Sequence, residues 1–379
     1  MHLFWLEIRE QALRSNVALF RHLAPDSRFM AVVKSNAYGH GLELCVRALA
    51  GHVDWFGVNS VPEAIRVRTI DADTPILIMG GNGYEGSALR EMSLEQRAQI
   101  SMVLSSADAL RDHLSQNPDV AFHIKVDTGL SRLGAGAEEF TRMLAVVRAA
   151  PEPSLWRGFM THFANVEDVT DQDYARRQLE EFTRMRELAA SEFRQFRPIL
   201  HSAASAPAMV LPESRMDLIR VGISLYGLWP SRETRLSLLS QLGQVPDLQP
   251  AMAFKARIVH VKHVRAGMDV GYGCTYRLRT DSTLAIIPVG YYEGYDRHLS
   301  NRAHVLIRGR RAPVLGRVSM NMIIVDVSHI PDVQPGEVAT LIGRDGDECV
   351  SVDDLAGLTG TINYEVCTRF IADVPRIAV

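Results

Sequence analysis

The sequence FMAVVKSNAYGHG (29–41) opens with a run of apolar residues that stops at a lysine, Lys34. Seven similar runs follow before residue 228: WFGVNS (55–60), PILIMG (75–80), SMVLSS (101–106), FHIKVD (122–127), GFMTHF (158–163), PILHSA (198–203) and DLIRVG (217–222). Short runs rich in Val, Ile and Phe are typical of parallel strands buried on both faces. The segments between them, such as 173–194, have helical spacing. Eight strand–helix units in about 230 residues predict a closed (β/α)₈ barrel.

The pattern changes after Trp229-Pro230. Residues 231–250 are polar and contain two prolines, which predicts a connector. Beyond them the runs alternate and are rich in β-branched residues: FKARIVHVKHV (254–264), STLAIIPVG (282–290), AHVLIRG (303–309), MIIVDVSH (322–329) and VATLIG (338–343). Such runs predict antiparallel strands, and only 351–358 has the pattern of a helix. We therefore predict a barrel over 1–235 and a mostly antiparallel β domain over 236–379.

Composition restricts the partners and the location of this protein. The 379 residues are 47% hydrophobic and 22% charged, and the net charge is −3. This balance gives no electrostatic reason to expect nucleic acid or a membrane surface as a partner. No apolar run approaches the ~20 residues of a membrane helix, and the start MHLFWLEIREQ lacks the order of a signal peptide. The four cysteines have no metal-ligand spacing. We expect a cytoplasmic, reduced protein without a structural metal.

The residues that follow the strands of such a barrel form its active site. Lys34 ends the first run, and this position has two interpretations. The lysine is either a nucleophilic amine that binds a carbonyl cofactor or a strand-end side chain that points into solvent. Ser205 follows the seventh run, and Gly222 and Ile223 follow the eighth. Loops after strands seven and eight are the usual phosphate site of this fold. A lysine and a phosphate site together point to an aldehyde cofactor with a phosphate, which is pyridoxal 5'-phosphate.

Eight motifs in this chain resemble those of the alanine racemases, in the order of that family. They are AVVKSNAYGHG (31–41), HIKVDTGLSRLG (123–134), MTHFA (160–164), RVGISLYG (220–227), VGYGCTY (270–276), PVGYYEGYDRHLSN (288–301), GRVSMNM (316–322) and TINYEV (361–366). The first, which is similar to the cofactor-lysine signature of the family, is the most specific. The resemblance covers nearly the whole chain. It implies a pyridoxal-phosphate enzyme that works as a homodimer and interconverts L- and D-alanine, supplying D-alanine for peptidoglycan.

The resemblance also implies roles for individual residues. Lys34 would hold the cofactor and act as one catalytic base, and Tyr272 would act as the other from the partner subunit. The implied cofactor contacts are Tyr38, Ser205, Gly222, Ile223 and Tyr364 around the phosphate, Arg220 at the pyridine nitrogen and His162 beside the ring. Arg132 would bind the substrate carboxylate, and Met320 would contact the substrate through its backbone.

These roles agree with the chemistry of racemisation, which needs two acid/base groups on opposite faces of the α-carbon. A tyrosine has an ordinary pKa near ~10, so Tyr272 needs an activating neighbour such as His162. Arg220 disfavours a proton on the ring nitrogen and so suppresses transamination. In some family members a lysine at the position of Lys125 is carbamylated and positions the carboxylate-binding arginine, and we hypothesise the same here.

Some residues depart from the family pattern. Asn321 stands where Asp is common, which predicts a lost charge beside the substrate entrance. Ala204 replaces a frequent Asn, and Ser319 a frequent Cys. A pocket with fewer fixed charges admits serine or larger amino acids as substrates. We expect Tyr276, Tyr291 and Arg297 at that entrance.

Three alternatives stay open at this point. A racemase of broader specificity is one. A decarboxylase of basic amino acids shares the architecture and the cofactor, but favours a carboxylate at the pyridine nitrogen, where Arg220 stands. A non-catalytic cofactor-binding protein with a single barrel would lack residues 251–379.

Overall fold

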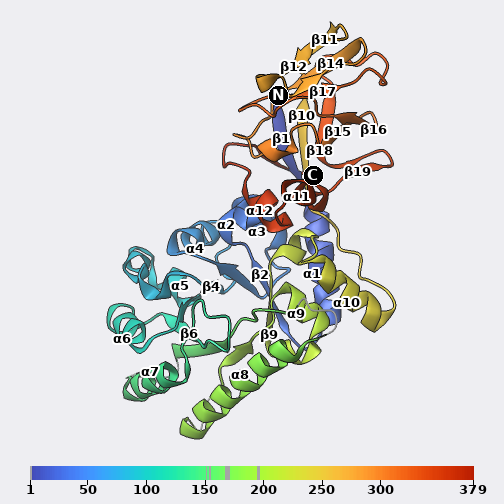
Figure 1. The fold of residues 1–379 in the computed structure, drawn as a ribbon. Coiled ribbons are helices and arrows are strands. Elements are labelled where there is room, and N and C mark those ends of the chain that lie inside the picture. The colour runs from blue at the N-terminus through green and yellow to red at the C-terminus, as the bar shows by residue number, and fades with distance from the viewer. Residues whose placement is uncertain (1, 151, 153–154, 167–170, 194–196) are drawn as a thin grey trace. The chain divides into compact units, whose positions relative to one another are not determined.

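The computed structural model describes residues 2–150, 152, 155–166, 171–193 and 197–379. The chain divides into two compact units (Figure 1). Unit 1 contains residues 1–10, 38–44 and 251–379, and unit 2 contains residues 11–37 and 45–250.

Unit 2 is built on eight parallel strands, in the spatial order β8-β7-β6-β5-β4-β3-β2-β9. The strands are β2 (Arg28–Val32), β3 (Trp55–Val58), β4 (Ile76–Ile78), β5 (Ile100–Leu104), β6 (Ala121–Lys125), β7 (Trp156–Met160), β8 (Ile199–His201) and β9 (Leu218–Val221). Each coincides with one of the eight apolar runs, so the predicted barrel is confirmed. Two backbone hydrogen bonds, from Asp217 to Leu200 and from Arg220 to Ala203, join the first strand of this order to the last.

Helices surround these strands (Figure 1). They are α1 (Glu10–Leu23), α3 (Leu42–Leu49), α4 (Val61–Arg68), α5 (Leu94–Ala98), α6 (Ala107–Gln116), α7 (Ala137–Ala149), α8 (Asp173–Glu192), α9 (Ser205–Val210) and α10 (Arg232–Leu242). Four of them begin after a serine whose hydroxyl accepts a first-turn N–H: Ser60, Ser93, Ser106 and Ser231. Such caps satisfy N–H groups that have no partner within the helix.

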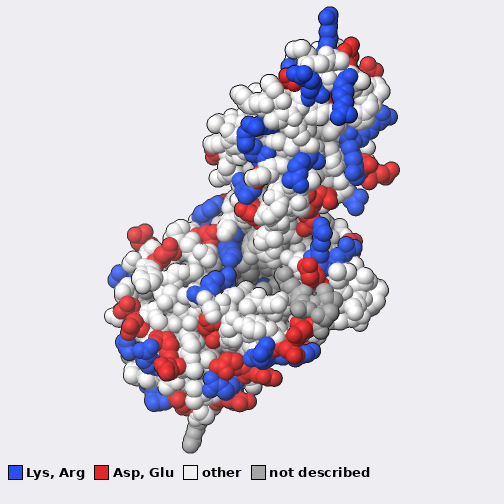
Figure 2. Space-filling model, viewed as in Figure 1, with Lys and Arg blue, Asp and Glu red and all other residues white. Residues whose placement is uncertain are grey.

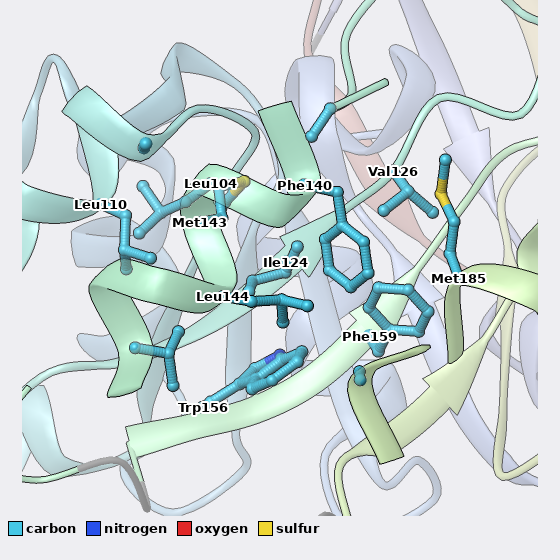
Figure 3. Close-up of a cluster of buried hydrophobic side chains, with 14 of the residues drawn as sticks. Leu104, Leu110, Ile124, Val126, Phe140, Met143, Leu144, Trp156, Phe159 and Met185 are labelled. Carbon is cyan, nitrogen blue, oxygen red and sulfur yellow. The ribbon is translucent and has the colours of Figure 1, made fainter. Parts of the chain in front are cut away.

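A cluster of buried side chains joins strands β5, β6 and β7 to helices α6, α7 and α8 (Figure 3). The ring of Phe159 stacks on that of Phe182 with centroids 4.8 Å apart, and it also contacts Phe140 at 5.3 Å. Phe182 and Met185 lie on α8, within the segment 173–194 whose spacing predicts a helix, and both are buried. Because this packing fixes the strands, it also fixes the residues that follow them.

Unit 1 is mostly antiparallel. Its largest sheet has the order β16-β15-β18-β10-β1-β20, with β19 on β18, and smaller sheets are β11-β14-β17 and β12-β13. The strands are β1 (Phe4–Ile8), β10 (Met252–Arg257), β11 (His260–Val264), β12 (Asp269–Val270), β13 (Tyr276–Arg277), β14 (Ser282–Ile287), β15 (His304–Ile307), β16 (Arg310–Pro313), β17 (Ile323–Asp326), β18 (Val338–Asp345), β19 (Glu348–Val350) and β20 (Arg376–Ala378). The helices are α11 (Val352–Thr359) and α12 (Asn363–Thr368). Helix α12 was not predicted.

The predicted boundary at 235/236 differs from the division in the structure. Strand β1 belongs to unit 1, because it pairs antiparallel with β10 and parallel with β20. Residues 236–250 belong to unit 2. The predicted connector is wrong in part, since helix α10 occupies Arg232–Leu242 and ends at Gly243, whose φ is 69°.

The visible face of unit 2 carries acidic and basic side chains mixed together (Figure 2), in agreement with the small net charge. Within the described ranges, no helix has the length and apolar character needed to cross a bilayer.

Candidate active site

Lys34 follows strand β2 and begins a left-handed turn. Residues 35–38 all have φ between 52° and 55°, a region that residues other than glycine rarely adopt. The Glu63 carboxylate stabilises this turn, because it accepts the N–H of Ser35 at 2.6 Å and that of Asn59 at 2.7 Å. Strained backbone of this kind is found mainly where function requires it. The turn fixes the backbone beside the lysine amine.

Three cationic side chains of unit 2 gather around Lys125: Lys34, Arg132 and Arg220 each lie close enough to lower the pKa of that lysine. Burial and then Arg132 lower the pKa of Lys34, while Glu63 acts in the opposite direction. Burial, Arg220 and Arg132 lower the pKa of Lys125 to about 8. Lys125 ends strand β6 and is 6% exposed. A concentration of positive charge of this kind favours anionic ligands.

Arg132 lies in the loop that follows β6. The Asp127 carboxylate accepts the N–H groups of residues 129, 130 and 131, at 2.9 to 3.1 Å. This closed turn brings the chain to Arg132, which is exposed. The predicted arginine is therefore presented by a rigid loop rather than by a strand.

Arg220 on β9 is 3% exposed, and neutral acceptors surround its guanidinium. It donates to the carbonyl oxygens of His201, Ser202 and Thr161 at 2.8 to 2.9 Å. It also donates to His201 Nδ1 at 3.0 Å and to His162 Nδ1 at 3.3 Å. These bonds use the two terminal nitrogens, whereas Nε–H donates to none of the described residues. Burial lowers the pKa of Arg220 to about 9, so the group stays charged at neutral pH.

Two buried histidines extend this network. Arginine can only donate, so His201 Nδ1 must accept, and the proton of His201 then lies on Nε2. That Nε2 lies 2.8 Å from His123 Nδ1, which must accept in turn. Burial, with Arg157 and Arg220, lowers the pKa of His123 to about 3, and burial and Arg220 lower that of His201. Both histidines are therefore neutral. Sequence reasoning gave them no role, although each lies on a barrel strand.

His162 follows strand β7, as predicted from the run GFMTHF, and its Nδ1 accepts from Arg220, a contact that was not predicted. Burial and then Arg220 lower the pKa of His162 well below its ordinary value, with smaller effects from Lys125, Arg132 and Lys34. The imidazole is therefore neutral at physiological pH.

The predicted phosphate residues of unit 2 lie together. Ser205 begins α9, and its hydroxyl accepts the N–H of Gly222 at 3.0 Å. Ile223 begins a short 3₁₀ turn, where a first-turn N–H has no acceptor within the helix. Ala204 occupies the cap position before α9 and makes no side-chain cap. Ser205 and Gly222 are therefore joined by a hydrogen bond, and the N–H of the adjacent Ile223 is placed to bind an anion.

The remaining predicted residues belong to unit 1. The rings of Tyr38 and Tyr364 lie 6.3 Å apart, and burial raises the pKa of Tyr38 to about 12. Tyr272 begins a short 3₁₀ turn (Tyr272–Cys274) and is 72% exposed. Met320 is 54% exposed. Beside it, Asn321 donates to the buried carboxylate of Glu293 at 2.6 Å. The predicted loss of a charge at Asn321 stays a prediction, and the structure adds that this side chain is bonded to the buried Glu293 carboxylate.

Comparisons with known proteins agree across the full length of the chain. The sequence matches the family model of the alanine racemase N-terminal domain over residues 8–230 and that of the C-terminal domain over residues 251–378. The alanine racemase of Leptospira interrogans is 41% identical over 99% of this chain and 95% of that protein. The alanine racemase of Geobacillus kaustophilus is 36% identical over 98% of this chain and 94% of that protein.

Solved structures give the same result. The alanine racemase of Streptomyces lavendulae has a TM-score of 0.88 at 31% identity, covering 100% of this chain and 97% of that one. The alanine racemase of Bacillus anthracis, with bound L-Ala-P, has a TM-score of 0.87 at 28% identity, covering 100% of this chain and 95% of that one. Matches to both domains, at this identity and over this length, mean that the chain belongs to the alanine racemase family.

Proposed function

We propose that this chain interconverts L-alanine and D-alanine with pyridoxal 5'-phosphate as its cofactor, and that it works in the cytoplasm as a homodimer that supplies D-alanine for peptidoglycan. The cationic cluster of Lys34, Lys125, Arg132 and Arg220 carries the proposal, because it combines an amine of lowered pKa with charges suited to anions. The relatives favour this reaction over the decarboxylase and over the single-barrel binding protein.

The residues present fit this cofactor. Its phosphate would contact the Ser205 hydroxyl and the N–H of Ile223. The resemblance implies further contacts with Gly222, whose N–H donates to Ser205 in this structure, and with Tyr38 and Tyr364. Nε–H of Arg220 would face the ring nitrogen, and His162 would lie beside the ring. Pyridoxal phosphate supplies an aldehyde that bonds to amines and a ring that withdraws electrons from the carbon next to them.

The protein's own groups would move the proton. Nζ of Lys34 would take or return it on one face of the substrate α-carbon, and Oη of Tyr272 would do so on the other. A lowered lysine pKa suits this role, because more of the amine is neutral and able to accept a proton. Arg132 would hold the substrate carboxylate, and the N–H of Met320 would contact it. Because Nδ1 of the neutral His162 accepts from Arg220, its proton lies on Nε2, which would donate a hydrogen bond to Oη of Tyr272.

The homodimer is supported by exposed apolar side chains on three adjoining loops of unit 1. Tyr272, Tyr292, Met320 and Met322 are 72%, 54%, 54% and 49% exposed. The loops adjoin because Tyr292 N–H donates to Met320 O at 2.9 Å and Gly273 packs against Arg317. A patch of this kind marks an interaction surface. A second copy of the chain would cover it and receive Tyr272.

Borohydride reduction tests the role of Lys34. The chain has four lysines, Lys34, Lys125, Lys255 and Lys262. We expect the purified protein to be yellow, and reduction to fix one pyridoxyl group on Lys34. Peptide mass mapping locates the group, and Lys262→Ala, which changes a lysine on strand β11, should be labelled normally. A label on Lys125 or Lys262 would contradict the assignment.

We also expect carbon dioxide to carbamylate Lys125. The reaction joins the neutral amine to carbon dioxide and releases a proton. With a pKa of about 8, roughly one amine in ten is neutral at pH ~7, against fewer than about one in a thousand for an ordinary lysine. The product is an anion, which the positive charges of Arg132 and Arg220 favour. Isotope-labelled bicarbonate should give a carbamate signal by NMR that strengthens as the pH rises toward ~8 and is missing in Lys125→Gln. An unmodified amine under these conditions would disprove the hypothesis.

A further inference from the structure

A buried carboxylate of unit 1 joins two turns of the chain. Glu293 is 4% exposed, and its Oε2 accepts the N–H of Gly290 at 2.8 Å. Its Oε1 accepts the side-chain amide of Asn321 at 2.6 Å. Within the described ranges no ion pair involves Glu293, so these two donors are what satisfy the carboxylate. Buried carboxylates need such donors, since an unsatisfied one is costly.

The backbones of the same two turns are also hydrogen-bonded. Tyr291 N–H donates to Ser319 O at 3.1 Å, and Tyr292 N–H donates to Met320 O at 2.9 Å. Gly290 allows this approach, because a Cβ at that position would lie 2.2 Å from Ser319 O. The turn at 319–322 is therefore held at Ser319 and Met320 by these backbone bonds, and at Asn321 by its bond to Glu293.

In this arrangement one of the two backbone polar groups of Met320, its N–H, remains available to a ligand. Its carbonyl accepts from Tyr292, whereas its N–H donates to none of the residues that the structure describes. A donor held on a rigid turn binds an incoming anion without first being ordered. The N–H of Met320 is therefore arranged for a ligand carboxylate.

We propose that Glu293 and Asn321 are positioning residues, which fix the N–H of Met320 for the carboxylate of the amino-acid substrate. This inference rests on the proposed function and deepens it. It also explains the side chain at 321. Asn donates to Glu293, whereas Asp would bring a second carboxylate against a buried one, and the two would repel or have to share a proton.

The first test is Asn321→Asp. We expect the KM for alanine to rise about tenfold while kcat changes less than about twofold, because the lost contact holds the substrate equally in the ground and transition states. Gln334→Glu is the matched control: it adds the same charge in an exposed turn of unit 1, beside Glu337, and should leave KM unchanged. Asn321→Ala removes the donor without adding charge, and we expect a rise of about threefold.

The second test is rescue by exchanging the two groups. In the double variant Glu293→Gln/Asn321→Asp, the Gln oxygen accepts from Gly290 and its amide donates to the new carboxylate. We expect KM to return to within about twofold of wild type. A double variant as impaired as Asn321→Asp, or an Asn321→Asp enzyme with wild-type KM, would overturn the proposal.

Amide hydrogen exchange gives a readout that does not need activity. Exchange in the 319–322 segment should accelerate in Asn321→Asp and Asn321→Ala, return to normal in the double variant, and stay normal in Gln334→Glu. Unchanged exchange in all variants would refute the positioning role even if KM changed. A wild-type protein that binds the cofactor and does not racemise alanine would refute the proposed function instead, while the exchange pattern would still test the positioning.

Discussion

Arg220→Glu is expected to lower the racemisation rate by about a hundred- to a thousandfold and to release a 2-oxo acid as a new product. Arginine donates hydrogen bonds and gives up no proton at neutral pH, so it disfavours a proton on the ring nitrogen. A carboxylate would favour that proton and strengthen the withdrawal of electrons. The amino group of the substrate would then pass to the cofactor more often, which is transamination. Chiral chromatography of alanine, with an assay for oxo acids, measures both products.

Arg220→Lys is the control for this prediction. It keeps the positive charge but cannot reach the acceptors that the guanidinium bonds, which are the carbonyls of Thr161, His201 and Ser202. We expect a slower enzyme that still forms only alanine. Circular dichroism and cofactor content confirm that both variants fold. If Arg220→Glu made no oxo acid and kept the wild-type rate, Arg220 would not face the ring.

The barrel could be predicted because of how its strands are buried. Strands covered on both faces need continuous apolar runs, so β2 to β9 are visible in the sequence one by one. Strand β1 was missed because its partners are distant. Phe4 pairs with Ala256 and Leu6 with Arg376, and nothing local in FWLEI indicates that pairing. Helix α10 was missed because its apolar residues are spread around it, and the prolines beyond it suggested a loop.

The candidate site, like the fold, could be predicted from the sequence only in part. Residues directly after strands, such as Lys34 and His162, can be found by position alone. The histidines at 123 and 201 cannot, because a buried histidine in a strand looks the same in sequence whether or not it accepts from an arginine. The role of Glu293 could not be predicted either. Asn321 is visible in the sequence as a departure from the family pattern, but its bond to Glu293 depends on a contact between two turns.

Tyr272→Ala and Lys34→Ala should each be almost inactive, yet a mixture of the two should regain activity. Each site of the proposed dimer combines Lys34 of one subunit with Tyr272 of the other, and a two-fold dimer has two such sites. Unfolding the variants together in equal amounts and refolding them gives about half mixed dimers by random pairing. In a mixed dimer one site carries both defects and the other carries neither. Activity should therefore recover to about a quarter of wild type.

Deuterated water separates the two bases. Lys34 alone remains in Tyr272→Ala, so the α-hydrogen of D-alanine should still exchange with solvent, without inversion, while that of L-alanine should not. Proton NMR follows the exchange, and the double variant Lys34→Ala/Tyr272→Ala, which lacks both bases, is the control for background rates. Because each base reaches one face only, the preference for one enantiomer is the diagnostic quantity. Equal exchange of both enantiomers in Tyr272→Ala would show that Lys34 serves both faces. A mixture that regained no activity would show that both bases come from the same subunit.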